Sequence, residues 1–246
     1  MIEYKGCQYC VHFRPDGTCP AFDPDTIPLP IVSGQIKHIK PVSNQENTIV
    51  YEPVKKSIIY RVDTYRTNNK LMRRRIEIIQ GDIKQQNVDA IVNAANEALI
   101  AGGGVSGSIH NAAGLGLEEE CLKLGGCQEE KAKITKGYNL PAKWVIHTVS
   151  PVWEGGNYGE HKILAQCYRS CFAFVEPYKI NTIAFPSIST GAYDFPIEIA
   201  AKIAIRETRL FLEQNTFIDK VFFICFEKDV YECYTLTLEK IIPEDF

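Results

Sequence analysis

Two side-chain amides and a run of glycines lie close together near residue 100 of this 246-residue chain. The amides belong to Asn93 and Asn96, and the glycines fall within residues 102–107. Amides can form hydrogen bonds with sugar hydroxyls or with a base. Glycine backbone at the start of a helix can approach phosphate oxygens closely, and the helix dipole favours an anion there. These residue types indicate a site for a nucleoside diphosphate, such as a nucleotide sugar or ADP-ribose.

The predicted strands and helices place this turn at the end of a strand. From residue 73 onward, short β-branched runs alternate with longer amphipathic stretches. Strands are predicted at residues 76–80, 88–93, 144–149, 182–186 and 220–226. Helices are predicted at residues 106–124, 128–136, 160–178, 197–214 and 230–241. This order predicts a mostly parallel sheet with helices on both faces, in which ligands bind at the carboxyl ends of the strands.

Other polar and aromatic side chains follow the predicted strands. Asp82 can accept a hydrogen bond from the amino group of a base, or it can simply cap a turn. Residues 189–192, Ser-Thr-Gly-Ala, offer hydroxyl and backbone N–H groups for a second phosphate contact. Tyr193 and Phe226 have flat faces suited to a sugar or a base, although Phe226 is equally consistent with core packing. Together these loops would surround one ligand.

Composition excludes several broad classes of protein. The net charge of −3 gives no basis for bulk nucleic-acid binding. The run 73–75, Arg-Arg-Arg, fits a solvated strand edge better than a phosphate site. No apolar run is long enough to span a bilayer, and the N-terminus lacks the pattern of a signal peptide, so we expect a cytoplasmic protein.

Several motifs in residues 73–246 resemble the macrodomain family in their order along the chain. They are Gly-Asp-Ile at 81–83, the segment 88–96 ending in Asn-Ala-Ala-Asn, the glycine loop, Ile-His-Asn-Ala-Ala-Gly at 109–114, Val-Ile-His-Thr-Val at 145–149, and Pro-Ser-Ile-Ser-Thr-Gly at 186–191. The resemblance implies a three-layer α/β/α fold with a mixed, mostly parallel sheet. It also implies that the chain binds ADP-ribose, and many members remove ADP-ribose from proteins or hydrolyse O-acetyl-ADP-ribose without a cofactor.

The resemblance also implies residue roles. Asp82 would hold the adenine amino group beside Ile83, and Phe226 would pack on the adenine. Asn96 and Tyr193 would contact the distal ribose, with Asn93 shaping the turn. The diphosphate would lie between two sets of residues: Gly103, Gly104 and Val105, and Ser189, Thr190, Gly191 and Ala192.

The chain departs from the family at two positions. Hydrolytic relatives usually carry an aspartate where this chain has Ser106, and that aspartate helps to position or activate water. Serine without a partner is no general base near neutral pH, and a Ser106–His110 pair on one helical face is an alternative that spacing permits. Asp194 replaces the usual glycine and either restores a carboxylate or only forms a turn. Two functions stay open, an ADP-ribosyl hydrolase and a non-catalytic reader of ADP-ribose.

A dinucleotide-dependent oxidoreductase is a weaker alternative. Gly102, Gly104 and Gly107 have the GxGxxG spacing, but eight residues separate Asn93, where the strand is predicted to end, from the first of these glycines. That fingerprint should instead follow its strand directly.

Three of the nine cysteines lie in the first twenty residues. Cys7, Cys10 and Cys19 have the pair spacing of a structural zinc site, with His38 preferred over His12 as a fourth ligand. Unligated thiols are the alternative. We expect residues 1–53 to form a small loop-rich module, residues 54–72 a connection, and residues 73–246 the macrodomain. The expected partner is ADP-ribose or an ADP-ribosylated protein, with no membrane and no nucleic acid.

Overall fold

The computed structural model describes residues 69–243. The predicted zinc ligands Cys7, Cys10, Cys19 and His38, and the whole segment 1–53, lie outside the described residues. The strands are β1 (Ile76–Gln80), β2 (Ala90–Ala95), β3 (Ala132–Lys136), β4 (Trp144–Val149), β5 (Thr182–Pro186) and β6 (Lys220–Cys225). The helices are the 3-10 helix η3 (Ile83–Gln85) and the α-helices α3 (Gly104–Ala113), α4 (Leu115–Leu124), α5 (Glu160–Phe172), α6 (Ile197–Gln214) and α7 (Lys228–Ile241).

The strands form a six-stranded sheet in the order β1-β6-β5-β2-β4-β3. All neighbouring strands run parallel except β3, which pairs antiparallel with β4. In the register of β2 with β4, Asn93 stands opposite His147. The predicted α/β fold with a mixed, mostly parallel sheet is therefore confirmed. The parallel strands share one carboxyl edge, where a ligand site is expected.

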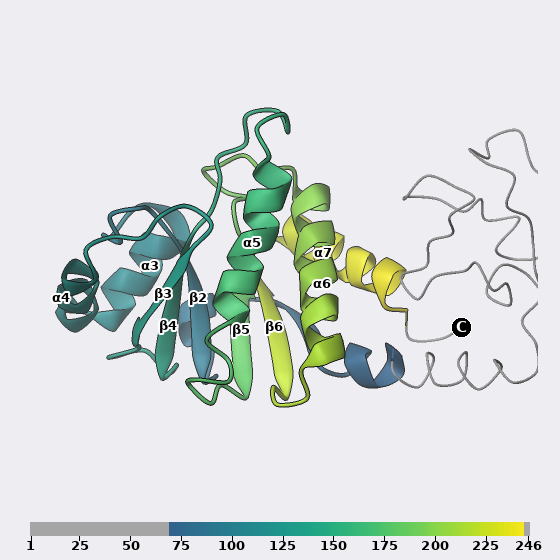
Figure 1. Ribbon diagram of the computed structural model, residues 1–246, viewed down its shortest axis with the longest axis horizontal. Coiled ribbons are helices and arrows are strands. Elements are labelled where there is room, and N and C mark those ends of the chain that lie inside the picture. Colours follow the sequence, from purple (N-terminus) through teal and green to yellow (C-terminus); the bar gives the residue numbers. More distant parts are fainter. Residues whose placement is uncertain (1–68, 244–246) are drawn as a thin grey trace, which may run out of the picture. The chain divides into compact units, whose positions relative to one another are not determined.

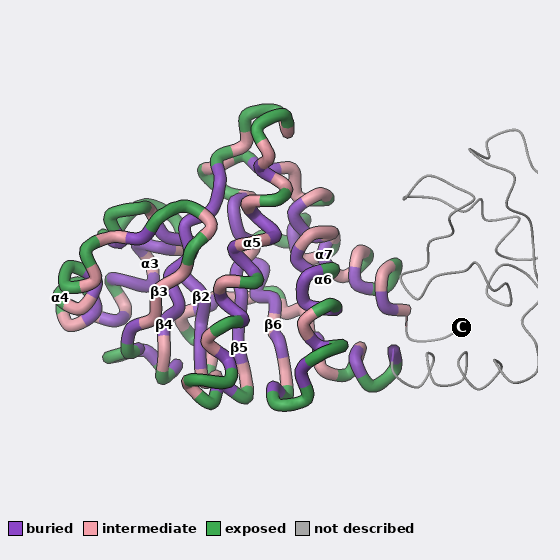
Figure 2. Tube along the Cα trace, in the orientation of Figure 1, coloured by how far each residue is buried: buried purple, intermediate pink, exposed green. Residues whose placement is uncertain are grey.

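The two faces of the sheet are covered by different helices. Alternate strand residues such as Val92, Ile146 and Phe185 pack with the buried faces of α5, α6 and α7. The residues between them, such as Ile91 and Val145, pack with α3 and α4. Figure 1 shows these layers, and Figure 2 shows that the central strands are buried. Because side chains alternate along a strand, Asn93 and His147 face α3 and α4.

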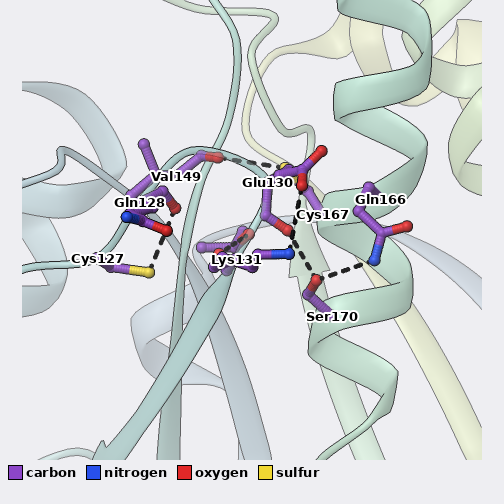
Figure 3. A network of polar contacts seen from close by, with 9 residues as sticks. Cys127, Gln128, Glu130, Lys131, Val149, Gln166, Cys167 and Ser170 are labelled. Carbon is purple, nitrogen blue, oxygen red and sulfur yellow. Dashed lines mark hydrogen bonds and ion pairs between the residues drawn. The ribbon is translucent and has the colours of Figure 1, made fainter.

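The predicted helix at residues 128–136 is wrong. Its second half is the strand β3, which pairs with β4 from Ala132 to Lys136. Polar contacts fix the preceding turn against β4 and α5 (Figure 3): Glu130 N–H donates to Val149 O at 2.9 Å, and Ser170 Oγ donates to Glu130 O at 2.7 Å. Pairing with the exposed edge of β4 outweighs the weak local helix preference.

The predicted helix at residues 106–124 is two helices. Gly114 ends α3 and begins α4 with φ 81° and ψ −177°. That conformation is open to glycine and strained for other residues. The break lets α3 lie at the glycine loop while α4 packs its buried Leu117 and Cys121 against the same face of the sheet.

The arginine run near residue 74 is partly a structural anchor. The Arg75 guanidinium donates to the carbonyl oxygens of Leu212 (3.3 Å), Asn215 (2.8 Å) and Ile218 (2.6 Å). These bonds tie the start of β1 to the last turn of α6 and to the connection between α6 and β6. Arg74 is exposed, as the sequence predicted, but Arg75 is not a solvated edge residue.

Within residues 69–243, no helix combines the length and the apolar character needed to cross a bilayer.

Candidate functional site

Five connections leave the carboxyl ends of the parallel strands at the same edge. They comprise residues 81–82 after β1, 96–103 after β2, 150–159 after β4, 187–196 after β5 and 226–227 after β6. Four of them carry the residues that the sequence pointed to. The fifth, residues 150–159, was not predicted to be part of the site.

The glycine loop is a compact turn that leads into α3. The Asn96 side chain closes it, because Nδ2 donates to Ile100 O at 2.9 Å and Oδ1 accepts from Ile100 N at 3.2 Å. Gly103 is the N-cap of α3, and Gly104 has φ 57°, a conformation that favours glycine. The first turn of α3 contains no acidic residue. Its N–H groups and dipole thus provide an anion site without local repulsion.

Ser106 lies in the first turn of α3. Its side chain is buried, and its Oγ accepts from Asn93 Nδ2 at 3.4 Å. His110 lies one turn further along α3 and is also buried, but neither of its ring nitrogens has a hydrogen-bond partner among the described residues. The helix therefore brings Ser106 and His110 to one face, as the spacing predicted, without joining them by a hydrogen bond.

A buried polar cluster lies beneath the turn, between the sheet and helices α3 and α4. The His147 ring bonds to Asn93 Nδ2 through Nδ1 (3.1 Å) and to Thr135 Oγ1 through Nε2 (2.9 Å). Because the Asn93 amide donates to Nδ1, the neutral ring carries its proton on Nε2. His110, Cys121 and His147 place one donor atom each within 4.8 Å of one another. That set could hold a metal ion, but both His147 nitrogens already have protein partners.

Burial makes His147 sensitive to acid. Desolvation, with a smaller contribution from His110, lowers the pKa of His147 to about 3. An unfolded chain binds the proton near its ordinary pKa of about 6.5, so protonation favours unfolding as pH falls below that value. As the pH falls, we expect the free energy of unfolding to decrease more steeply in the wild type than in His147→Gln. The difference between the two slopes should be up to about 1.4 kcal/mol per pH unit. Urea unfolding at a series of pH values between about 7 and 4 measures both slopes; parallel curves would contradict the prediction.

The loop after β5 is held in a strained conformation. Ser189 and Asp194 have φ values of 66° and 51°, which are unusual for residues other than glycine. The Ser189 hydroxyl donates to Pro151 O at 3.1 Å and the Thr190 hydroxyl donates to Ser187 O at 3.0 Å. Both hydroxyl protons are thus used within the protein. Hydroxyl lone pairs and backbone N–H groups are what this loop can offer a ligand.

The opposite end of the edge carries a carboxylate and an exposed ring. Asp82 caps η3 by accepting from Lys84 N at 3.1 Å, and its other oxygen pairs with Lys84 Nζ at 3.1 Å. A carboxylate has further lone pairs, so it can still accept from an amino group. Ile83 is buried beside it, whereas the Phe226 side chain is 72% exposed. Such exposure is unusual for phenylalanine and fits a stacking surface rather than core packing.

The fold and this edge define a nucleotide-binding α/β protein, because an anion-binding helix start, a carboxylate and an exposed ring all follow the ends of parallel strands. A model of the family described as "Macro domain" matches residues 92–204. A Macro domain-containing protein from Methanosarcina mazei is 54% identical over 168 residues, which cover 68% of this chain and 90% of that protein. The chain belongs to the macrodomain family.

Further relatives have names that describe an activity. The O-acetyl-ADP-ribose deacetylase of Salmonella gallinarum is 44% identical over 68% of this chain and 96% of its own length. The ADP-ribose glycohydrolase MACROD2 of Xenopus laevis is 47% identical over 70% of this chain and 41% of its own length. The structure of a Trypanosoma brucei macrodomain in complex with ADP-ribose superposes with a TM-score of 0.64 at 41% identity, covering 67% of this chain and 69% of that one.

Proposed function

We propose that this protein binds ADP-ribose and hydrolyses its bond to a modified protein or to an acetyl group. One observation carries the proposal: the glycine loop at the start of α3 and the strained loop at residues 189–194 follow parallel strands at one sheet edge, with Asp82 and Phe226 at the same edge. Similarity to a glycohydrolase, a deacetylase and an ADP-ribose complex supports it.

In this proposal the ligand extends along the strand ends. Asp82 accepts from the adenine amino group, Ile83 lies beside the base, and Phe226 stacks on it. Asn96 and Tyr193 contact the distal ribose, and Asn93 supports their turn from below. The diphosphate lies between the two loops, against Gly103, Gly104 and Val105 on one side and Ser189, Thr190, Gly191 and Ala192 on the other.

Hydrolysis requires a water molecule placed at the bond that breaks. For a protein modified on aspartate or glutamate, water attacks the anomeric carbon of the distal ribose, and the side-chain carboxylate leaves. Ser106 supplies no carboxylate for this step, so the ligand's own phosphate, His110 or Asp194 would have to hold the water. Asp194 is exposed at the end of the strained loop.

The alternative is a reader that binds ADP-ribose without turnover. The observation that favours it is Ser106 itself, which offers no carboxylate and is buried and bonded to Asn93. The two functions share the same binding residues and differ only in whether the bond is cleaved.

Two measurements separate these outcomes. Calorimetric titration of the full chain with ADP-ribose should show saturable binding. Incubation with a target protein ADP-ribosylated on aspartate or glutamate should then release the label, and O-acetyl-ADP-ribose should release acetate. Binding without turnover of either substrate would support the non-catalytic ADP-ribose reader. The absence of saturable binding at millimolar ADP-ribose would overturn the whole proposal.

A further proposal rests on the sequence alone. Residues 1–53 form a module that precedes the connection 54–72 and the macrodomain 73–246, and Cys7, Cys10, Cys19 and His38 hold a structural zinc ion there. The proposal of a cytoplasmic location also rests on the sequence alone.

A further inference from the structure

The connection between β4 and α5, residues 150–159, is the β4–α5 loop. It lies beside the loop at residues 187–196. Figure 1 shows it rising above α5 next to the loop that leads into α6. Trp153 N–H donates to Tyr193 O at 2.9 Å, and Pro151 O accepts from Ser189 Oγ at 3.1 Å. The β4–α5 loop therefore bonds to both ends of the segment proposed to line the diphosphate and distal ribose, through the Ser189 side chain at one end and the Tyr193 main chain at the other.

Ring contacts reinforce this junction. The Trp153 ring lies 4.7 Å from the Phe195 ring and 5.3 Å from the His161 ring, measured between centroids. Phe195 is buried and follows Asp194 directly. A displacement of Trp153 would therefore be transmitted to the strained loop through both the backbone and the core.

The β4–α5 loop has little intrinsic preference for one conformation. Gly155, Gly156 and Gly159 have φ values of 93°, 84° and 86°. Glycine-rich segments lose more conformational entropy on ordering than other sequences do. A specific set of interactions must therefore hold this loop in place.

Those interactions converge on one buried carboxylate. Glu160, the first residue of α5, is only 2% exposed. Its Oε1 accepts from Glu154 N at 3.1 Å and from Gly156 N at 2.9 Å, and its Oε2 accepts from Tyr158 N at 2.8 Å. Hydrogen bonds to a charged acceptor are stronger than neutral ones. Burial alone would raise the pKa of Glu160, but the backbone N–H donors outweigh it and lower that pKa.

We propose that Glu160 is a positioning residue for ligand binding: its carboxylate orders the β4–α5 loop, which in turn holds the Ser189–Tyr193 wall in its binding conformation. This inference rests on the proposed function, because it assigns a supporting role at the same site. Glu160 touches no ligand itself and acts through Trp153 and Pro151.

A merely structural cap for α5 is the competing explanation. The three N–H groups belong to residues 154, 156 and 158, which precede the helix and lie in the loop. Loss of a helix cap would lower stability and leave the affinity of the folded protein unchanged. Loss of a positioning residue would weaken binding while the domain stays folded.

The test uses Glu160→Gln in the full chain and Glu154→Gln as a matched control in the same loop. An amide keeps the shape of the carboxylate but loses the charge and one acceptor oxygen. The chain has two tryptophans, Trp144 and Trp153. A Trp144→Phe background leaves Trp153 as the only tryptophan that reports on the loop.

We expect Glu160→Gln to raise the Kd for ADP-ribose about 5- to 10-fold and to make Trp153 more accessible to acrylamide quenching. Saturating ADP-ribose should restore the quenching of the parent protein, because the ligand then orders the loop. Glu154→Gln should match the parent in both measurements. An unchanged Kd in a folded Glu160→Gln protein overturns the proposal, as does a raised Kd with unchanged quenching.

A second variant covers the case in which Glu160→Gln fails to fold. A Cβ on Gly156 would lie 2.8 Å from the Trp153 ring and 3.1 Å from the His161 ring, so Gly156→Ala displaces the loop while Glu160 stays intact. It should weaken ADP-ribose binding to a similar degree, and wild-type affinity in this variant would overturn the proposal. If the parent protein binds no ADP-ribose, the proposed function fails instead, and unliganded quenching still shows whether Glu160 orders the loop.

Discussion

Ser106→Asp is expected to raise the turnover of an ADP-ribosylated protein about 10- to 100-fold, with little change in the Kd for ADP-ribose. The substitution places a carboxylate in the first turn of α3, where the resemblance to hydrolytic macrodomains implies an aspartate. General acid–base catalysis by a positioned side chain contributes roughly 10²–10⁴-fold, so a partly optimal geometry should still give a measurable gain.

The surroundings of Ser106 can accommodate this charge. The first turn of α3 has no acidic residue, and a carboxylate near a helix N-terminus is favoured by about 0.3–1 kcal/mol. Asn93 Nδ2, which already donates to Ser106 Oγ, can donate to the new carboxylate. The buried position would otherwise make the charge costly.

Single-turnover release of label from a protein modified on aspartate or glutamate measures the effect. Ser108→Asp is the control, since it adds the same charge to the same helix at a side chain bonded to Lys84 Nζ. Equal rates for Ser106→Asp and the wild type would mean that the missing aspartate does not limit turnover. Asp194→Asn would then test the other carboxylate, and a loss of activity in that variant would assign the role to Asp194.

Gly107→Ala is expected to weaken ADP-ribose binding by at least about 30-fold and to lower the melting temperature by several degrees. A Cβ at residue 107 would lie 2.2 Å from the carbonyl oxygen of Gly102 and 3.3 Å from its carbonyl carbon. Both are backbone atoms, so the glycine loop itself must move. Alanine is about 1 kcal/mol better than glycine inside a helix, but overpacking against rigid atoms costs roughly 1–3 kcal/mol or more. The loop that moves is the one proposed to bind the diphosphate.

Gly103→Ala is the control for stability. A Cβ there would meet no atom within 4 Å, so its melting temperature should stay close to that of the wild type. Calorimetric titration well below both melting temperatures separates a displaced loop from an unfolded domain. A Gly107→Ala protein with wild-type affinity would show that the contact between α3 and the glycine loop does not shape the binding site.

Motifs that act through local backbone geometry could be identified from the sequence. The amides at residues 93 and 96, the glycines at 102–107 and the loop at 189–192 owe their properties to residue type and short-range spacing. Their positions at strand ends followed from the alternation of strands and helices. The structure places Asn96, the glycines and residues 189–192 in connections at one edge of the sheet, whereas Asn93 lies inside β2 and is buried.

Features that depend on distant partners were missed or predicted wrongly. Residues 132–136 carry no strong strand signal, and they form β3 only because β4 offers an unpaired edge. The role of the β4–α5 loop was also missed, although Trp153 and three glycines between residues 155 and 159 were visible signals. The residues next to Glu160 in the sequence do not indicate that its carboxylate accepts hydrogen bonds from three backbone N–H groups of that loop.

Apart from β3 and the break between α3 and α4, the sequence by itself determined the order of elements, the family and the chemical groups near the strand ends, because those depend on residue type and short-range spacing. Only the tertiary structure decided which of these groups are free for a ligand. Ser106 is turned toward Asn93, and the hydroxyls of Ser189 and Thr190 donate to main-chain carbonyls. The physical reason is that a buried polar group must find a partner, and that partner is set by packing between segments far apart in the chain.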